Sequence, residues 1–98
     1  MMVTYDTKHL ASTCTVDREM RKAYPANMLK PLKLRIKEME SASTIRDLQE
    51  GLGKWHPLTG RGAGVYAASL SANYRLIVQF DERDGAVTAN VRSIEDYH

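Results

Sequence analysis

The spacing of hydrophobic residues is helical in the first half of the chain. From about residue 8 to residue 41, apolar residues recur at intervals of three and four, which would stack them on one helix face. Pro25 and Pro31 argue against one unbroken helix, because a proline inside a helix removes a backbone hydrogen bond. We therefore predict a break near Tyr24–Pro25, with Pro31 in the first turn of a second helix. The stacked residues are Met28, Leu32, Ile36 and Met39.

After Gly53 the pattern changes to the alternation that is typical of strands. Three runs are separated by residues 71–73 and 81–85, which are rich in turn-forming types. Such short connections favour antiparallel neighbours. The expected strands are Val65–Leu70, Tyr74–Phe80 and Ala86–Ile94.

Two further elements complete the expected order. Val3–Asp6 is typical of a short opening strand, and Thr44–Leu48 of a short helix that the Thr44 side chain can cap. Helices followed by a run of strands indicate an α+β fold. We predict a single domain over residues 1–98, with the N-terminal strand and two helices packed on one face of a small antiparallel sheet. The C-terminal part of that sheet would be a three-strand meander.

Alternation also predicts which side chains share a face of the sheet. Tyr74, Leu76, Val78 and Phe80 would pack beneath the helices. In the last strand, Asn90, Arg92 and Ile94 would lie opposite the apolar side. If the chain stays extended to its end, one open face carries Arg75, Arg92, Asp96 and His98.

The composition is that of an ordinary globular protein, with 43% hydrophobic and 27% charged residues among 98. No apolar run approaches the roughly 18 residues of a membrane-spanning helix, so no membrane association is expected. The first residues lack the apolar region of a secretory signal. Cys14 is the lone cysteine and cannot form an internal disulfide, so a cytoplasmic location is expected.

The net charge of +2 does not by itself indicate a nucleic-acid partner, but its distribution is uneven. Seven basic residues lie between Asp17 and Lys37, against Asp17 and Glu19. This stretch would hold a polyanion such as RNA or an acidic partner, or would be a solvated helix face. The seven are Arg18, Arg21, Lys22, Lys30, Lys33, Arg35 and Lys37.

Residues suited to RNA cleavage occur in three segments of the second half: 54–64, 73–75 and 95–98. Attack by the RNA's own 2′-hydroxyl needs a base, an acid and a cation beside the phosphate, and no metal. Two histidines can exchange protons near neutral pH, and an arginine fork matches phosphate oxygens. Each segment also has a plain alternative: His56 can begin a strand, Arg75 can pair with a surface acid, and the last residues can fray.

Four motifs occur in these segments: His56-Pro57-Leu58-Thr59-Gly60, Gly64-Val65-Tyr66, Asn73-Tyr74-Arg75-Leu76 and Asp96-Tyr97-His98. In content, order and spacing they resemble those of the HigB-type toxins of the RelE/ParE superfamily, the plasmid maintenance killer proteins. The resemblance covers nearly half of the chain. The N-terminal half is similar only in its plan of a strand, two helices and a short segment before the histidine.

The resemblance implies the toxin of a toxin–antitoxin pair, a ribosome-dependent mRNA endoribonuclease that inhibits translation without a cofactor. Its partners would be the ribosome, mRNA and a HigA-like helix-turn-helix antitoxin. Carried over by position, Arg75 would stabilise the phosphate, and the acid and base would come from the histidines in either order. The implied catalytic group is His56, Arg75, Asp96, Tyr97 and His98. Lys54, Arg61 and Arg92 are the basic residues expected to contact RNA.

Departures from the family pattern leave alternatives open. Thr59 stands where many relatives have a basic residue, and Arg61 could replace it if the glycine-rich turn carries it inward. Residues 65–68 are smaller than in relatives, and Trp55 is expected to pack rather than to stack on a base. A metal site of His56, Asp96 and His98 would be a poor cage. The alternative function is a non-catalytic binding protein on the same fold, either a decayed toxin or a gyrase-directed relative.

Overall fold

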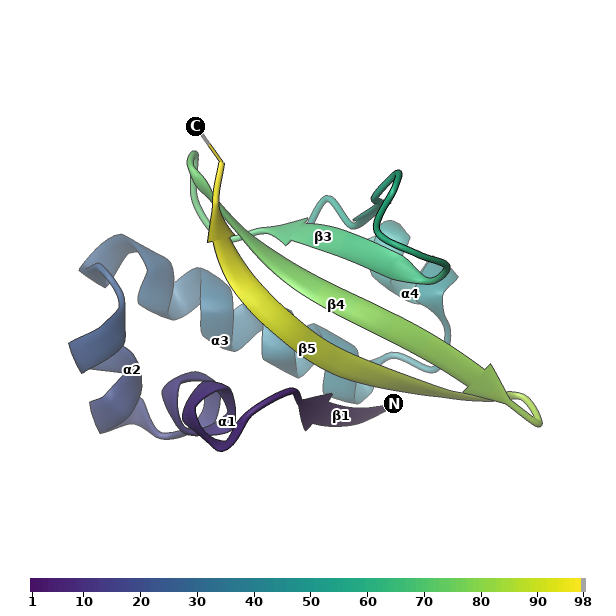
Figure 1. Ribbon diagram of the computed structural model, residues 1–98, viewed down its shortest axis with the longest axis horizontal. Coiled ribbons are helices and arrows are strands. Elements are labelled where there is room, and N and C mark those ends of the chain that lie inside the picture. The colour runs from purple at the N-terminus through teal and green to yellow at the C-terminus, as the bar shows by residue number, and fades with distance from the viewer. Residues whose placement is uncertain (98) are drawn as a thin grey trace.

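The computed structural model describes residues 1–97, and its helices lie together against one side of a twisted sheet (Figure 1). His98 lies outside the described residues. The elements are, in chain order, β1 (Met2–Tyr5), α1 (Lys8–Thr15), α2 (Asp17–Ala23), α3 (Ala26–Ser41), α4 (Ile45–Gln49), β2 (His56–Pro57), β3 (Val65–Ser69), β4 (Tyr74–Arg83) and β5 (Ala86–Asp96). The predicted α+β class is confirmed.

The helical region contains one more break than predicted. Val16 adopts an extended conformation with φ −100° and ends α1 before α2 begins. The predicted break at Tyr24–Pro25 is present, since Tyr24 ends α2 and Pro25 precedes α3. Pro31 is not in the first turn of α3 but inside the helix, five residues after Ala26. Because Pro31 has no N–H, it cannot donate the usual helical hydrogen bond to the carbonyl of Asn27, which is an exposed residue.

The short α4 is capped as its sequence predicts. The Thr44 side chain accepts a hydrogen bond from the Asp47 N–H at 3.1 Å, and the Asp47 carboxylate accepts one from the Thr44 N–H at 3.1 Å. Hydrogen bonds from the N–H groups of Ser43 and Thr44 lower the pKa of the Asp47 carboxyl, together with the side chain of Thr44. The capping box fixes where the chain leaves the helices for the second half of the molecule.

Within residues 1–97 the sheet has five strands in the order β1-β5-β4-β3-β2. The meander of β3, β4 and β5 is antiparallel as predicted, and β2 adds a two-residue edge. β1 instead pairs parallel to β5, with Val3 aligned to Ala89. The helical half of the chain is the crossover that makes this parallel pairing possible. β4 also runs to Arg83, because the turn tightens to Asp84 and Gly85, which both have positive φ.

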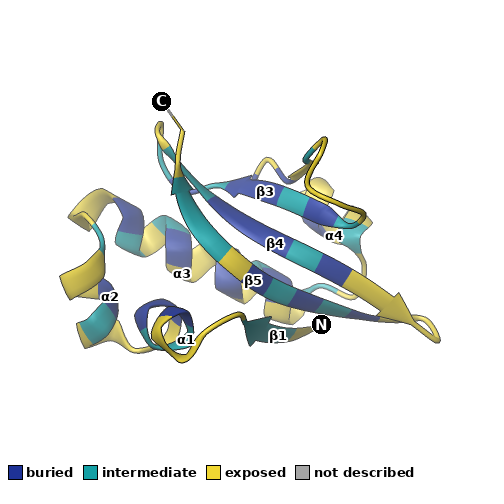
Figure 2. Cartoon of the chain, viewed as in Figure 1, coloured by how far each residue is buried: buried dark blue, intermediate teal, exposed yellow. Residues whose placement is uncertain are grey.

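The main core lies between the helices and the sheet (Figure 2). The predicted stripe of α3 is buried, and Leu76, Val78 and Phe80 face it from β4. Trp55 is buried, as expected, with its ring edge-on to Phe80 at 5.8 Å between centroids. No helix of the described chain combines the length and the apolar character that crossing a membrane requires.

A β-bulge in β5 changes the faces of its last residues. Ile77 aligns with Ser93, but the next residue of β4, Val78, aligns with Val91, so Arg92 is an additional residue in β5. A bulge of this kind shifts by one the alternation of all residues that follow. The face pattern predicted from strict alternation therefore holds only as far as Arg92.

Beyond the bulge, two predicted positions are wrong. Ile94 aligns with Leu76 and packs against the main core, not on the open face. Asp96 aligns with Tyr74, whose ring also packs toward the core, so the register places Asp96 on the side opposite Arg75. Glu95 occupies the position on the open face, directly opposite Arg75.

Candidate active site

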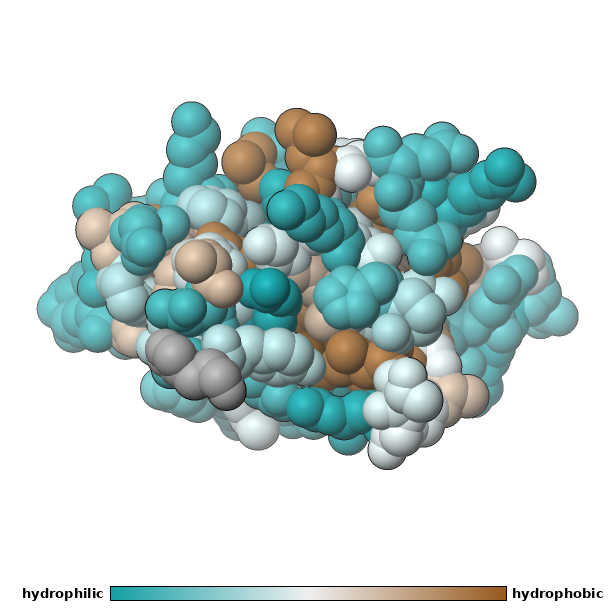
Figure 3. All heavy atoms as spheres, turned by 90° about the horizontal axis from the view of Figure 1, so that it is seen from above, coloured by the Kyte–Doolittle hydropathy of each residue, from teal (hydrophilic) through white to brown (hydrophobic). Residues whose placement is uncertain are grey.

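The face of the sheet away from the helices is shallow and mostly polar. Four of its central residues, Leu58, Val65, Ala67 and Ile77, form a second small apolar cluster. Seen from above, toward the edge of the sheet where β3 lies, the surface shows hydrophobic patches between hydrophilic side chains (Figure 3). We call this side of the sheet the open face. It presents charged and aromatic side chains around an apolar floor.

Arg75 is fixed at the start of β4 by the turn that precedes it. Its Nη1 donates to the carbonyl of Ser71 at 2.9 Å and to the carbonyl of Tyr74 at 3.1 Å. The guanidinium lies over the ring of Tyr97, 5.7 Å from the centroid. The Tyr97 N–H in turn donates to the carbonyl of Asn73 at 2.5 Å. The structure therefore brings together two of the predicted site residues, Arg75 and Tyr97, in a cation–π contact.

Arg61 reaches the open face from the loop between β2 and β3. Its Nη1 and Nη2 donate to the two carboxylate oxygens of Glu95 at 2.8 and 2.7 Å. Hydrogen bonds from Arg61 lower the pKa of Glu95, and the same bonds raise the pKa of Arg61. The glycine-rich turn thus carries Arg61 to Glu95 on the open face, while its contact with a phosphate stays a prediction. Glu95, which receives it, was not selected as a site residue from the sequence.

Arg92, the residue added by the bulge, is the third guanidinium on this face. Its Nε donates to Asp6 Oδ2 at 3.1 Å, and its Nη1 donates to Gln79. Asp6 also accepts a hydrogen bond from Asn90 at 2.9 Å. A depression of about 170 Å³ lies between Arg92 and Arg61. The two arginines thus flank one hollow, each held by a carboxylate.

His56 lies exposed on the edge strand β2, aligned with Ala67. Its Nδ1 is 2.9 Å from the carbonyl oxygen of Lys54. A carbonyl oxygen can only accept, so Nδ1 carries the hydrogen of this bond. In the neutral ring Nε2 is then the basic nitrogen. Lys54 itself is exposed and has a positive φ of 54°.

The residue before His56 anchors this edge to α3. Trp55 Nε1 donates to Glu38 Oε1 at 3.2 Å, and Glu38 Oε2 pairs with Arg35 Nη2 at 3.0 Å. Gly53 leaves space for this arrangement, since a Cβ there would lie 2.5 Å from Trp55 Nε1. The backbone that carries His56 is therefore held by the buried Trp55 ring and by an ion pair of which Arg35 is buried and Glu38 half-buried.

His56 and Arg75 lie on the same face but are not adjacent. Ala67, the partner of His56, aligns with Ile77, two residues from Arg75. Two strand spacings and a two-residue step separate their Cα atoms by about 12 Å. The open face is thus wide enough for an extended polyanion. In the described part of the chain, no group of three or more His, Cys, Asp or Glu residues is placed to hold a metal ion.

The fold is that of the YoeB/ParE toxins. A YoeB/ParE toxin from Agrobacterium tumefaciens superposes with a TM-score of 0.69 at 18% identity, covering all of both chains. The YoeB dimer from Staphylococcus aureus gives a TM-score of 0.64 at 18% identity, covering 100% of this chain and 97% of that chain.

In sequence, the chain is similar to the endoribonuclease HigB from Proteus vulgaris. The two are 28% identical over 91 residues, which are 93% of this chain and 95% of that protein. No protein-family model matches the chain. Together, the relative and the fold confirm the resemblance to HigB-type toxins of the RelE/ParE superfamily that the motifs indicated.

Proposed function

We propose that the chain is the toxin of a toxin–antitoxin pair and an endoribonuclease that cuts messenger RNA on the ribosome. The observation that carries the proposal is the open face, where Arg75, Arg61 and Arg92 surround an apolar floor with His56 at its edge. The likeness to an endoribonuclease over almost the whole chain supports the same chemistry.

The reaction would be attack of a 2′-hydroxyl on the adjacent phosphate. Arg75 would stabilise the negative charge that develops on the phosphate oxygens, because its fork stays charged and is already oriented. Tyr97, which lies beneath that guanidinium, would stack on a base or bond to the phosphate. His56 would transfer a proton through Nε2, and His98 would be the second proton-transfer residue.

Asp96 lies on the face of the sheet opposite to Arg75, so it would orient an imidazole and would not contact the phosphate. Its register position opposite Tyr74 directs it away from Arg75, so it does not supplement the charge of the open face. Lys54, Arg61 and Arg92 would contact the flanking phosphates. Arg61 and Arg92 each hold a carboxylate, so the RNA would have to compete with Glu95 and Asp6 for them.

The proposed protein partner is a HigA-like helix-turn-helix antitoxin. Two solved complexes of a structural neighbour support an antitoxin partner, since the YoeB toxin from Staphylococcus aureus is found there with YefM. The chain overlays the toxin of one of these complexes with a TM-score of 0.61 at 19% identity. In the cell, the toxin would be active only when the antitoxin is lost.

The test is to map new 5′ ends in cellular transcripts after brief induction of wild-type and variant chains. His56→Gln and Arg75→Lys should each reduce cleavage by about 100-fold or more, because each removes a group from the proposed transition state. His9→Gln and Arg83→Lys are matched controls, since both residues are exposed and distant from the proposed site: His9 lies on α1, and Arg83 lies at the far end of β4, eight residues from Arg75. New ends within translated messages are expected for the wild type and for both controls.

A contrary result would separate the two candidate activities. If growth stops and no new ends appear, the chain acts by binding, as a gyrase-directed or decayed relative would. If His56→Gln and Arg75→Lys cut as efficiently as their controls, the proposed site is wrong even though a nuclease is present.

A further inference from the structure

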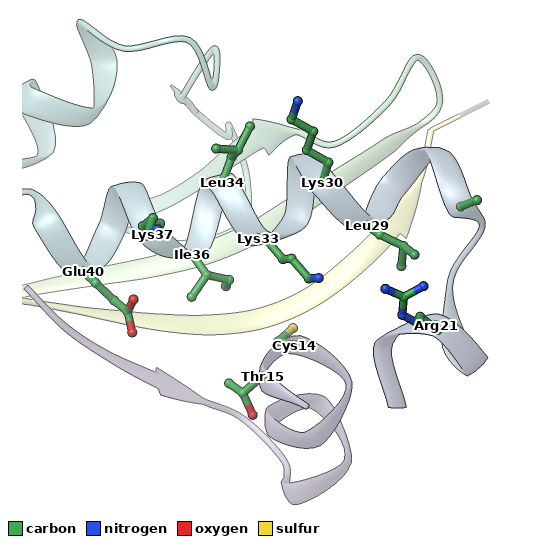
Figure 4. Close-up of a pocket in the computed structure, with 11 residues that line it drawn as sticks. Cys14, Thr15, Arg21, Leu29, Lys30, Lys33, Leu34, Ile36, Lys37 and Glu40 are labelled. Carbon is green, nitrogen blue, oxygen red and sulfur yellow. The ribbon is translucent and has the colours of Figure 1, made fainter. Parts of the chain in front are cut away.

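A groove lies on the helical side of the molecule, between α3 and the pair α1 and α2. Its volume is about 590 Å³. Figure 4 shows α3 running along one wall, with the ends of α1 and α2 on the other and the sheet behind. The groove is therefore separate from the open face that carries the proposed active site.

The floor and upper edge of the groove are apolar. Leu29 is half-buried, Ile36 and Cys14 are buried, and Leu34 is 43% exposed at the edge. Burial raises the pKa of the Cys14 thiol to about 11, which keeps it neutral at physiological pH. An apolar strip of this kind would gain from contact with apolar side chains of a partner.

The rim of the groove is basic. Arg21 and Lys33 both pair with Asp17, while Lys30 and Lys37 extend from α3 (Figure 4). With Glu40 at one end, four basic side chains stand against two acidic ones, which leaves two positive charges. Arg35, which the sequence placed in the same basic stretch, is buried against Glu38 and does not contribute.

The lining side chains repeat along α3 with a spacing of seven residues. Leu29 and Ile36 form one such pair, and Lys30 and Lys37 form another. Seven residues are two helical turns, about 10.5 Å along the axis. A second helix packed along α3 presents apolar residues with the same repeat, flanked by positions that reach the lysines.

We propose that this groove binds an acidic, amphipathic helix of a protein partner. Apolar residues of that helix would cover Leu29 and Ile36 inside the groove and Leu34 at its outer edge, and its carboxylates would pair with Lys30 and Lys37, which lie between them on α3. An RNA backbone would pair with the basic rim, because its phosphates are negatively charged. It would not cover the apolar side chains of the groove, because phosphate groups gain no free energy from contact with apolar surface. That the partner is the antitoxin rests on the function proposed above.

The direct test uses two labelled peptides of one composition. One is a helical peptide with leucines on one face and glutamates flanking them, and the other is a scrambled version without an apolar face. We expect the amphipathic peptide to bind the wild-type chain at least tenfold more tightly, as measured by fluorescence anisotropy. Lys30→Glu with Lys37→Glu, and separately Leu34→Asp, should each weaken it at least tenfold.

Lys8→Glu with Arg83→Glu is the control, because it changes the net charge equally at exposed positions outside the groove. Equal binding of the two peptides, or equal binding to the groove and control variants, would overturn the proposal. So would a labelled single-stranded RNA that binds more tightly than the peptide and loses affinity with the same groove variants. Circular dichroism of each variant confirms that its helices remain folded.

The antitoxin readout distinguishes the two proposals. When the helix-turn-helix antitoxin is co-expressed, the Lys30→Glu, Lys37→Glu chain should cut transcripts as the wild type does but resist neutralisation. Neutralisation at the wild-type level would place the antitoxin elsewhere and remove it as the partner of the groove. If the wild-type chain does not cut transcripts, the proposed nuclease activity is wrong, but peptide binding to the groove is still supported by the anisotropy measurement.

Discussion

The loop that carries Arg61 joins the sheet at Gly64, and this residue gives a sharp stability prediction. Gly64 has φ of +77°, and a Cβ there would lie 2.6 Å from the carbonyl oxygen of Phe80. The carbonyl of Gly64 also accepts a hydrogen bond from the Phe80 N–H at 2.8 Å. Alanine at this position would therefore strain the backbone and push β3 away from β4.

The size of the effect follows from two separate costs. A left-handed conformation at a non-glycine residue costs about 1–2 kcal/mol. Forcing a methyl group against a backbone atom adds about 1–3 kcal/mol, because neither strand can rotate away as a flexible side chain would. Gly64→Ala should thus lower the free energy of unfolding by about 2–5 kcal/mol. Gly60→Ala is the matched control, since Gly60 has φ of +81° but open space around its Cβ position.

Urea unfolding followed by far-ultraviolet circular dichroism measures both variants. Gly60→Ala should lose only the backbone cost, about 1–2 kcal/mol. The difference between the two alanine variants then reports the close approach of β3 to β4 alone. Equal losses would show that β3 and β4 do not approach each other at Gly64 and Phe80 as described.

Three further predictions follow from the same contacts. Cys14 is buried, so a thiol reagent should label it only on unfolding, and rapid labelling of the folded chain would contradict its burial. Burial raises the pKa of its thiol to about 11, while the unfolded chain has the ordinary value of about 8.5. The free energy of unfolding should therefore fall as the pH rises from about 8.5 toward 11. Arg61 lowers the pKa of Glu95, so the stability that this pair adds should be present above about pH 4.3, the ordinary value for glutamate, and should be lost as the pH falls through the lowered value. Glu95→Gln should remove that part of the acid dependence, as pH-dependent thermal unfolding would measure, while Glu82→Gln on the exposed end of β4 should not. Trp55→Phe should cost about 1 kcal/mol through its lost hydrogen bond to Glu38, and an unchanged midpoint of urea unfolding would argue against that bond.

The elements that depend on local pattern were predictable from the sequence. The buried stripe of α3 follows from its apolar spacing, and the meander follows from alternation with short turns. The break at Val16 was missed because a β-branched residue without a neighbouring glycine or proline gives no local signal for a helix end. The parallel pairing of β1 with β5 was also missed, since it joins residues about as far apart as the chain allows.

The candidate site shows the same division between local and long-range information. Motif order selected Arg75 and Tyr97, which the structure brings into contact. It could not select Glu95, because the reason for its position is a bulge that becomes visible only when β5 is aligned with β4. One added residue at Arg92 moved Asp96 off the open face and put Glu95 on it, within reach of a loop residue 34 positions earlier.

The central claim is that the open face cuts RNA by 2′-hydroxyl attack. The most direct measurement is to incubate the purified chain with a defined message on programmed ribosomes, and to analyse the 3′ ends of the fragments. The account predicts cuts that end in a 2′,3′-cyclic phosphate, without added divalent metal beyond what the ribosome requires, and their loss with Arg75→Lys but not with Arg83→Lys. Intact message, or fragments ending in a 3′-hydroxyl, would contradict it.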